Sequence, residues 1–372
     1  MPAARAGSGL MVIPLYPGRV STAVRLADLT TLGLGGPAPA LVTVTTPAEL
    51  AAAMRATAGT PVLVLGGGSN LVVADAGVPG PVIRVAIPGV HYGPEQDDGA
   101  VDVTVGAGED WDTLVEQVVR HGLTGLAPLS GIPGSTGATP VQNVGAYGTE
   151  VSDLLVSVTV YDRTTGELRS VPAAELALGY RTSALRGTDR AVVTDVTFRL
   201  SRRPTAVRYA ELAAALGVEP GNTAPEPVIR EAVLGLRRAK GMVIEPGTRD
   251  PDTRSAGSFF TNPILDDEAL ARAETAIRAR LGEDVRFPRY PAEGGTKLSA
   301  AWLIDRAGFG KGFQGPGGRV AVSTKHTLAL VNRGGTTADL LALAQQIRDG
   351  VRAAFAVDLH PEPVLVGVTF AG

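Results

Sequence analysis

The stretch GIPGSTGATPVQNVGAYG, residues 131–148, holds five glycines and two prolines among eighteen residues, and no charged side chain. A simple connection between two elements does not need this composition. Glycines leave backbone N–H groups accessible and allow close approach, so the stretch suits a large ligand that bears phosphates. A long disordered loop is the alternative, but the apolar Ile132, Val141 and Val144 favour a buried loop.

A second glycine-rich stretch, LGGGSN at residues 65–70, directly follows an expected β run. Three consecutive glycines permit positive φ and can present successive N–H groups to a pyrophosphate. The stretch is not the GxGxxG fingerprint of dinucleotide-binding folds, because no amphipathic helix follows it directly. A plain tight turn stays open as the alternative for this stretch taken alone.

The composition restricts the chemistry. The 372 residues are 44% hydrophobic and 19% charged with a net charge of −3, which excludes wholesale disorder and gives no electrostatic case for binding nucleic acid. There is no cysteine, so disulfides and thiolate chemistry are excluded, and none of the four histidines pairs with another at metal-ligand spacing. We therefore expect no metal site. No stretch could span a membrane and no signal peptide is convincing, so we expect a cytoplasmic protein without membrane contact.

Apolar periodicity predicts an α+β chain whose first part is rich in strands and whose last part is rich in helices, with a boundary near residue 204. Thr46 and Glu49 are expected to form a capping box at the first helix. The expected helices are 46–58, 110–121, 225–240, 263–281, 298–307 and 337–355. The expected strands are 61–65, 71–73, 82–87, 101–105, 155–161, 168–171, 191–200, 258–260, 327–331 and 364–370.

Several further motifs occur in a fixed order: VGAGEDW at 105–111, GYRTS at 179–183, AGSFFTNP at 256–263, KLSAAWLID at 297–305 and HPEPV at 360–364. Together with the two glycine-rich stretches, they make the chain from about residue 31 onward resemble the UDP-N-acetylenolpyruvoylglucosamine reductase family of peptidoglycan synthesis. The resemblance implies a two-lobed FAD-binding fold of the vanillyl-alcohol-oxidase type with a C-terminal α+β substrate-binding domain. It implies an extension at 1–17, FAD-binding subdomains at 18–90 and 91–203, a substrate-binding domain at 204–362, and a strand at 363–372 that returns to the FAD-binding region.

The resemblance also implies an activity and its cofactors. The chain would bind FAD without a covalent tether, use NADPH as co-substrate, and reduce the enolpyruvyl group of a UDP-sugar, as a monomer. The residues expected to contact FAD come from the two glycine-rich stretches: Gly66, Gly67, Gly68, Ser69, Asn70, Gly131, Ile132, Pro133, Gly134, Gly137, Ala138, Asn143, Gly145 and Ala146.

Three residues match the family's catalytic positions. Arg181 would bind the substrate carboxylate, and its planar fork suits a two-point contact that lysine could not reproduce. Ser258 would donate a proton to carbon, and Glu362 would either orient that serine or supply the proton itself; the sequence leaves both roles of Glu362 open. The residues expected to touch substrate are Tyr147, Tyr209, Lys240, Asn262 and His326.

Two rival functions remain. An alcohol oxidase on the same fold often tethers its flavin through histidine or cysteine, but cysteine is absent and neither glycine-rich stretch contains histidine. A non-catalytic nucleotide-binding protein would be expected to lose Arg181, Ser258 or Glu362, and all three are present. The pattern departs from the family at His360, where an acidic residue is common.

Overall fold

The computed structural model describes residues 18–370 except 246, 248 and 249. The expected N-terminal extension and the last two residues of the expected C-terminal segment lie outside the described residues. The helices of the described part are α1 Pro47–Ala56, α2 Trp111–Arg120, α3 Ala210–Leu216, α4 Glu226–Ala239, α5 Asp267–Leu281, α6 Ala300–Arg306 and α7 Thr337–Phe355. None of these helices is both long enough and apolar enough to cross a bilayer.

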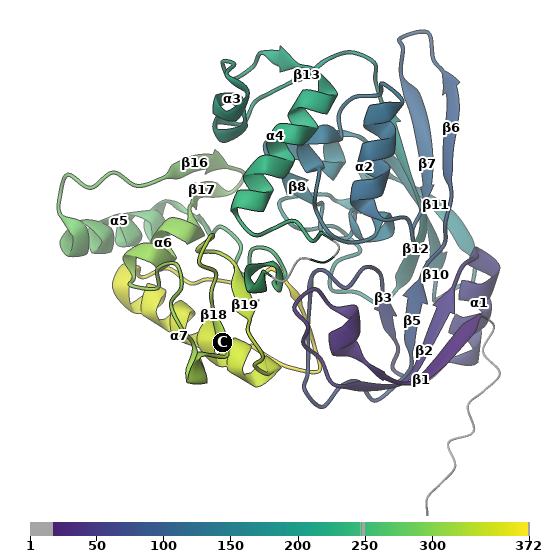
Figure 1. Cartoon of the computed structure of the whole chain (residues 1–372), viewed down its shortest axis with the longest axis horizontal. Helices are drawn as coiled ribbons and strands as arrows, with labels where there is room; N and C mark the ends of the chain where they lie inside the picture. The colour runs from purple at the N-terminus through teal and green to yellow at the C-terminus, as the bar shows by residue number, and fades with distance from the viewer. Residues whose placement is uncertain (1–17, 246, 248–249, 371–372) are drawn as a thin grey trace, which may run out of the picture.

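A mixed sheet in the order β1-β2-β5-β3 forms the first layer, with β1 at Arg19–Arg25, β2 at Pro37–Val44, β5 at Val82–Val85 and β3 at Leu63–Leu65. Strand β1 runs antiparallel to β2, whereas β2, β5 and β3 are parallel to one another. The 65–70 stretch leaves the end of β3, so the parallel sheet fixes where its glycine turn lies (Figure 1).

An antiparallel sheet in the order β11-β10-β12-β7-β6 forms the second layer (Figure 1). Its strands are β11 Leu168–Pro172, β10 Leu155–Asp162, β12 Ala191–Leu200, β7 Val101–Gly106 and β6 Val90–Glu95. The expected hairpin of β10 and β11 is confirmed, with Val158 opposite Val171. Strand β6 was not expected, because Gly93 and Pro94 weaken the strand pattern of its sequence.

The remaining strands are short. They are the β15-β17-β16 sheet (Ile264–Leu265, Gly295–Leu298, Arg289–Ala292) and the pairs β18/β19 (Val320–Val322, Leu330–Asn332), β13/β14 (Thr205–Ala206, Thr223–Ala224) and β8/β9 (Gly145–Ala146, Thr149–Glu150). Strand β20, Val364–Val366, lies parallel to β4, Leu71–Val73, so the end of the chain returns beside the glycine turn.

Several local expectations are wrong in detail. The helix expected at 263–281 begins at Asp267 after strand β15, and the strands expected at 327–331 and 364–370 are found at Leu330–Asn332 and Val364–Val366.

Residues 258–260 form two isolated bridges rather than a strand. Ser258 pairs with Ala329 and Phe260 pairs with Pro361, so each neighbouring segment pairs with this stretch at one position only. At α1, the Thr46 hydroxyl does accept from the Glu49 N–H at 3.1 Å. The Glu49 carboxylate, however, accepts from the N–H of Thr45 at 2.7 Å and not from the N–H of Thr46, which a capping box requires.

The apolar core has two large clusters of buried side chains among the described residues. One cluster joins α1, α2 and both large sheets, and it includes Val207, Leu212 and Ile229 of the α3–α4 region. A second cluster joins α5, α6 and α7 with β18 and β19. The apolar face of α4 is therefore buried against the first part of the chain.

Candidate active site

The two glycine-rich stretches pack directly on each other. A Cβ added to Gly67 would lie 2.6 Å from the Cα of Gly134, and one added to Gly66 would lie 2.4 Å from the Ser135 hydroxyl. Gly68 has φ +66°, and its absent Cβ would meet the Leu29 carbonyl oxygen at 1.9 Å. Glycine is therefore required at these positions by the packing of the protein itself. Because the glycines carry no side chains, the backbone beside them stays accessible.

This accessible backbone borders a cavity of about 660 Å³, within the range of about 300–1,000 Å³ typical of ligand pockets. Predicted FAD residues that line it are Gly66, Gly67, Gly68, Ser69, Asn70, Ile132, Pro133, Gly134, Gly137 and Ala138. Arg186 is a cation on its wall that the sequence analysis missed. A cavity of this volume, with glycine turns on its wall that expose backbone N–H groups, fits a dinucleotide such as FAD.

The four other predicted FAD residues lie elsewhere. Gly145 and Ala146 line a neighbouring pocket. Gly131 has φ +70° and packs on Leu234 and Arg237. The buried side-chain amide of Asn143 donates to the Glu150 carboxylate at 2.8 Å and to the Gly179 carbonyl at 3.1 Å. Asn143 thus ties the loop to the segment that carries Arg181.

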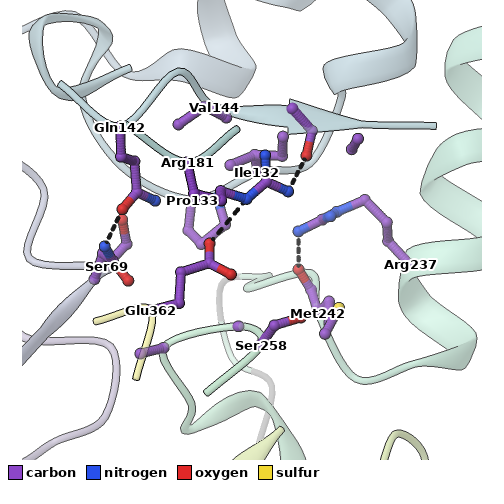
Figure 2. A pocket seen from close by; sticks show the side chains of 15 residues that line it. Ser69, Ile132, Pro133, Gln142, Val144, Arg181, Arg237, Met242, Ser258 and Glu362 are labelled. Atoms are coloured by element: carbon purple, nitrogen blue, oxygen red, sulfur yellow. Dashed lines mark hydrogen bonds and ion pairs between the residues drawn. The ribbon is translucent and has the colours of Figure 1, made fainter. Parts of the chain in front are cut away.

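The neighbouring pocket has a volume of about 150 Å³. Figure 2 shows the side chains that line it. This pocket and the large cavity share the residues Ser69, Asn70, Ile132, Pro133, Gln142 and Val144. Arg181, Ser258 and Glu362, far apart in sequence, all line the smaller pocket. We call it the catalytic pocket and the larger one the flavin cavity.

Arg181 is held in an unusual backbone conformation. It has φ +54°, inside a narrow turn in which the N–H groups of Gly179 and Thr182 donate to each other's carbonyl oxygens. Its guanidinium donates to the Gly145 carbonyl at 2.8 Å and pairs with the Glu362 carboxylate at 3.2 Å. A left-handed conformation costs about 1 kcal/mol or more for a non-glycine residue, so surrounding contacts must hold it.

Ser258 and Glu362 are brought together by the backbone. The N–H of Glu362 donates to the Phe259 carbonyl at 2.9 Å, beside the bridge of Phe260 with Pro361. Gly257, with φ +73°, makes the turn just before the serine. The two side chains therefore enter the catalytic pocket from adjacent chain segments, and Arg181 enters from the opposite side (Figure 2).

Burial raises the pKa of Glu362, and the positive charges of Arg181 and Arg186 oppose that rise. The side chain is 14% exposed. A carboxyl whose pKa is raised in this way keeps its proton to higher pH than one in water, which favours Glu362 as a proton source.

Three predicted substrate residues form one cluster. The rings of Tyr147 and Tyr209 meet edge to face at 5.7 Å, and the Lys240 ammonium lies 5.5 Å from the centre of the Tyr147 ring. Lys240 also pairs with Glu211 at 2.7 Å. Burial raises the pKa of Tyr147 to about 12, so its hydroxyl remains protonated and can donate a hydrogen bond.

The last two predicted substrate residues differ in setting. Burial, reinforced by the charge of Lys240, lowers the pKa of His326 to about 4, so its ring is neutral at pH 7. Asn262 uses its side-chain oxygen to accept from the Ala300 N–H at 2.9 Å, at the start of α6. Its side chain is thus engaged in capping the helix.

Arg237 is a site residue that the sequence analysis missed. It lines the catalytic pocket, is 9% exposed, and donates to the Met242 carbonyl at 3.0 Å. Its Nε is buried without a partner among the described residues. The sequence could have indicated Arg237, because it lies three residues before Lys240 and therefore on the same face at the end of α4.

Comparison with known proteins gives the family. The FAD binding domain model matches residues 38–171, and the model of the UDP-N-acetylenolpyruvoylglucosamine reductase C-terminal domain matches residues 250–366. A UDP-N-acetylenolpyruvoylglucosamine reductase of Saccharopolyspora erythraea is 58% identical over 347 residues, covering 92% of this chain and 94% of that protein. This chain belongs to the UDP-N-acetylenolpyruvoylglucosamine reductase family.

Other members of the family agree. One from Thermobifida fusca is 55% identical and covers 93% of this chain and 98% of that protein. The crystal structure of the Thermus caldophilus UDP-N-acetylenolpyruvylglucosamine reductase matches with a TM-score of 0.63 at 29% identity, over 94% of this chain and 99% of that one. The expected fold class and the FAD-dependent oxidoreductase assignment are confirmed.

Proposed function

We propose that this chain reduces the enolpyruvyl group of UDP-N-acetyl-3-O-(1-carboxyvinyl)-glucosamine to give UDP-N-acetylmuramate, with NADPH as the reductant. The observation that supports this best is the meeting of Arg181, Ser258 and Glu362 in a pocket that adjoins the flavin cavity. The relatives' names supply the substrate class.

When bound and reduced by NADPH, FAD supplies a hydride to C3 of the enolpyruvyl group. Breaking the C2–C3 double bond then places negative charge on C2 and the attached carboxylate. Arg181 binds that carboxylate and stabilises the added charge, while Ser258 protonates C2 from the pocket's other side. Glu362 lies between them, where it can orient the serine or provide the proton.

The cluster of Tyr147, Tyr209 and Lys240 would bind the nucleotide part of the substrate. Its ammonium and two phenol hydroxyls suit a pyrophosphate, since all three groups donate hydrogen bonds to anionic oxygens. Binding of the pyrophosphate must compete with Glu211 for Lys240.

Asn262 and His326 remain proposed contacts of the substrate. We also propose a domain division at residues 90, 203 and 362, a monomeric state and a cytoplasmic location. Limited proteolysis tests the division, light scattering tests the monomer, and cell fractionation tests the location.

Spectroscopy and turnover test the proposed function together. The purified chain should be yellow and release unmodified FAD on mild denaturation, whereas a tethered flavin would favour the rival alcohol oxidase. NADPH oxidation should depend on the enolpyruvyl substrate, with UDP-N-acetylmuramate identified by mass spectrometry. A protein that takes up no FAD, or that oxidises NADPH equally with and without this substrate, would contradict the proposal.

A further inference from the structure

Arg186 contacts the backbone of two catalytic residues at once. One Nη atom donates to the carbonyl oxygen of Arg181, and the other donates to the carbonyl oxygen of Glu362 at 3.0 Å. The two residues it joins are 181 positions apart in sequence. Arg186 lines the flavin cavity but not the catalytic pocket, so it lies behind the two residues rather than among the reacting groups.

The two carbonyl groups sit at positions where small shifts matter. Arg181 has the left-handed φ of +54°, and a hydrogen bond to its carbonyl helps hold that conformation. Glu362 is connected to Ser258 through the Phe259 carbonyl, so fixing its backbone also fixes its distance from the serine. The 3.2 Å pair between Arg181 and Glu362 depends on both backbones together.

We propose that Arg186 is a positioning residue that sets the separation of Arg181 and Glu362 by binding the backbone carbonyl of each. This inference rests on the proposed function. Arginine suits the task because its rigid fork presents several N–H donors in one plane, whereas lysine presents a single flexible ammonium. A displacement of about 1 Å can lower an enzymatic rate by about 10²-fold, so such positioning has a measurable effect.

The charge of Arg186 gives a second readout. The charged and titratable groups around the Glu362 carboxyl are Arg181, Arg186 and Tyr180. Both arginines lower the pKa of Glu362 against the effect of burial. Removing the Arg186 charge should therefore raise the pKa of Glu362, whereas Arg186→Lys keeps the charge while losing the two-point contact.

The test compares Arg186→Met, Arg186→Lys and the control Arg163→Met in the flavin-loaded full chain. Arg163 binds the same loop from outside, donating to the Asp189 carbonyl at 2.9 Å, but touches neither catalytic residue. In Arg186→Met we expect flavin reduction by NADPH at a near-normal rate and reoxidation by the enolpyruvyl substrate about 10–100-fold slower. Arg186→Lys should recover part of that loss, and Arg163→Met should behave as wild type.

A titration separates positioning from loosening of the loop. The ¹³C carboxyl signal of Glu362, assigned by its disappearance in Glu362→Gln, should titrate at higher pH in Arg186→Met and at an unchanged pH in Arg186→Lys and Arg163→Met. Normal reoxidation in Arg186→Met, equal slowing of both half-reactions, or the same slowing in Arg163→Met would overturn the inference. If the wild-type chain itself fails to reoxidise with this substrate, the proposed function fails instead.

Discussion

The flavin cavity and the catalytic pocket lie side by side, but they are built from different materials. The cavity is lined by glycines together with many apolar side chains from several segments, including Val364 and Leu365. Its shape depends on the close packing of Gly66, Gly67 and Gly68, where a Cβ would collide with neighbouring atoms. The pocket gathers the charged side chains of Arg181, Arg237 and Glu362 and the Ser258 hydroxyl from distant segments. The cavity should therefore be disrupted by adding a methyl group, and the pocket by removing a functional group.

The largest effect should come from Ser258→Ala in the catalytic pocket. Losing a positioned proton donor costs roughly 10²–10⁴-fold, so reoxidation of the flavin by the enolpyruvyl substrate should slow by that factor. Reduction by NADPH needs no proton at carbon and should be unaffected. Stopped-flow absorbance measures both steps, and equal slowing of the two would make Ser258 a structural residue.

Glu362→Gln should reduce kcat by about 10²-fold with little change in KM, because it removes the acid while keeping its size. Burial raises the pKa of Glu362, so its active protonated form is lost as pH rises through that pKa. The wild-type rate should accordingly fall on the alkaline side, and this limb should be absent in the variant. Near-normal kcat would show that Glu362 is not involved.

Arg181→Lys keeps the positive charge in the pocket but replaces the planar guanidinium, which can make a two-point contact, with a single ammonium group. Charge-assisted hydrogen bonds contribute about 1.5–3 kcal/mol, so kcat/KM should fall by about 10–100-fold, with KM raised and kcat lowered together. Steady-state kinetics at saturating NADPH measure both constants. A change in KM alone would mean that Arg181 acts only in binding.

The cavity is tested by Gly67→Ala. The added Cβ would lie 2.6 Å from the Gly134 Cα, a backbone atom that cannot move aside, so we expect a loss of about 3 kcal/mol in the free energy of unfolding and reduced FAD occupancy. Gly235→Ala is the matched control, because the α4 glycine has open space and an ordinary φ. It should be neutral or stabilising. Equal FAD content in both variants would show that the close packing of Gly67 on Gly134 does not shape the flavin cavity.

The smallest effect concerns His326. The folded chain lowers its pKa from 6.5 to about 4, so between these values the unfolded chain binds more protons than the folded one. Stability is therefore complete above pH 6.5 and is lost as pH falls. Between pH 7 and pH 5 the wild type should lose about 2 kcal/mol more than His326→Gln, measured by urea unfolding. Parallel losses would show that His326 is solvated.

The sequence was most informative where the signal is local. Glycine and proline density predicted both loops, and apolar periodicity predicted α2 and the β10–β11 hairpin. The contacts of Arg186 could not be predicted, because they join carbonyl groups that only the tertiary fold brings together. The packing of α4 against the first part of the chain could not be predicted either, since an amphipathic pattern does not show which surface its apolar face will contact.

The pairing of β20 with β4 has a consequence for biosynthesis. The N–H of Val364 donates to the Asn70 carbonyl at 2.9 Å, so the glycine turn is completed by a strand that follows it far along the chain. A ribosome must synthesise all of the intervening residues before this strand can pair with β4. Any product that stops before residue 366 would therefore carry an unpaired edge at β4 that proteases can recognise.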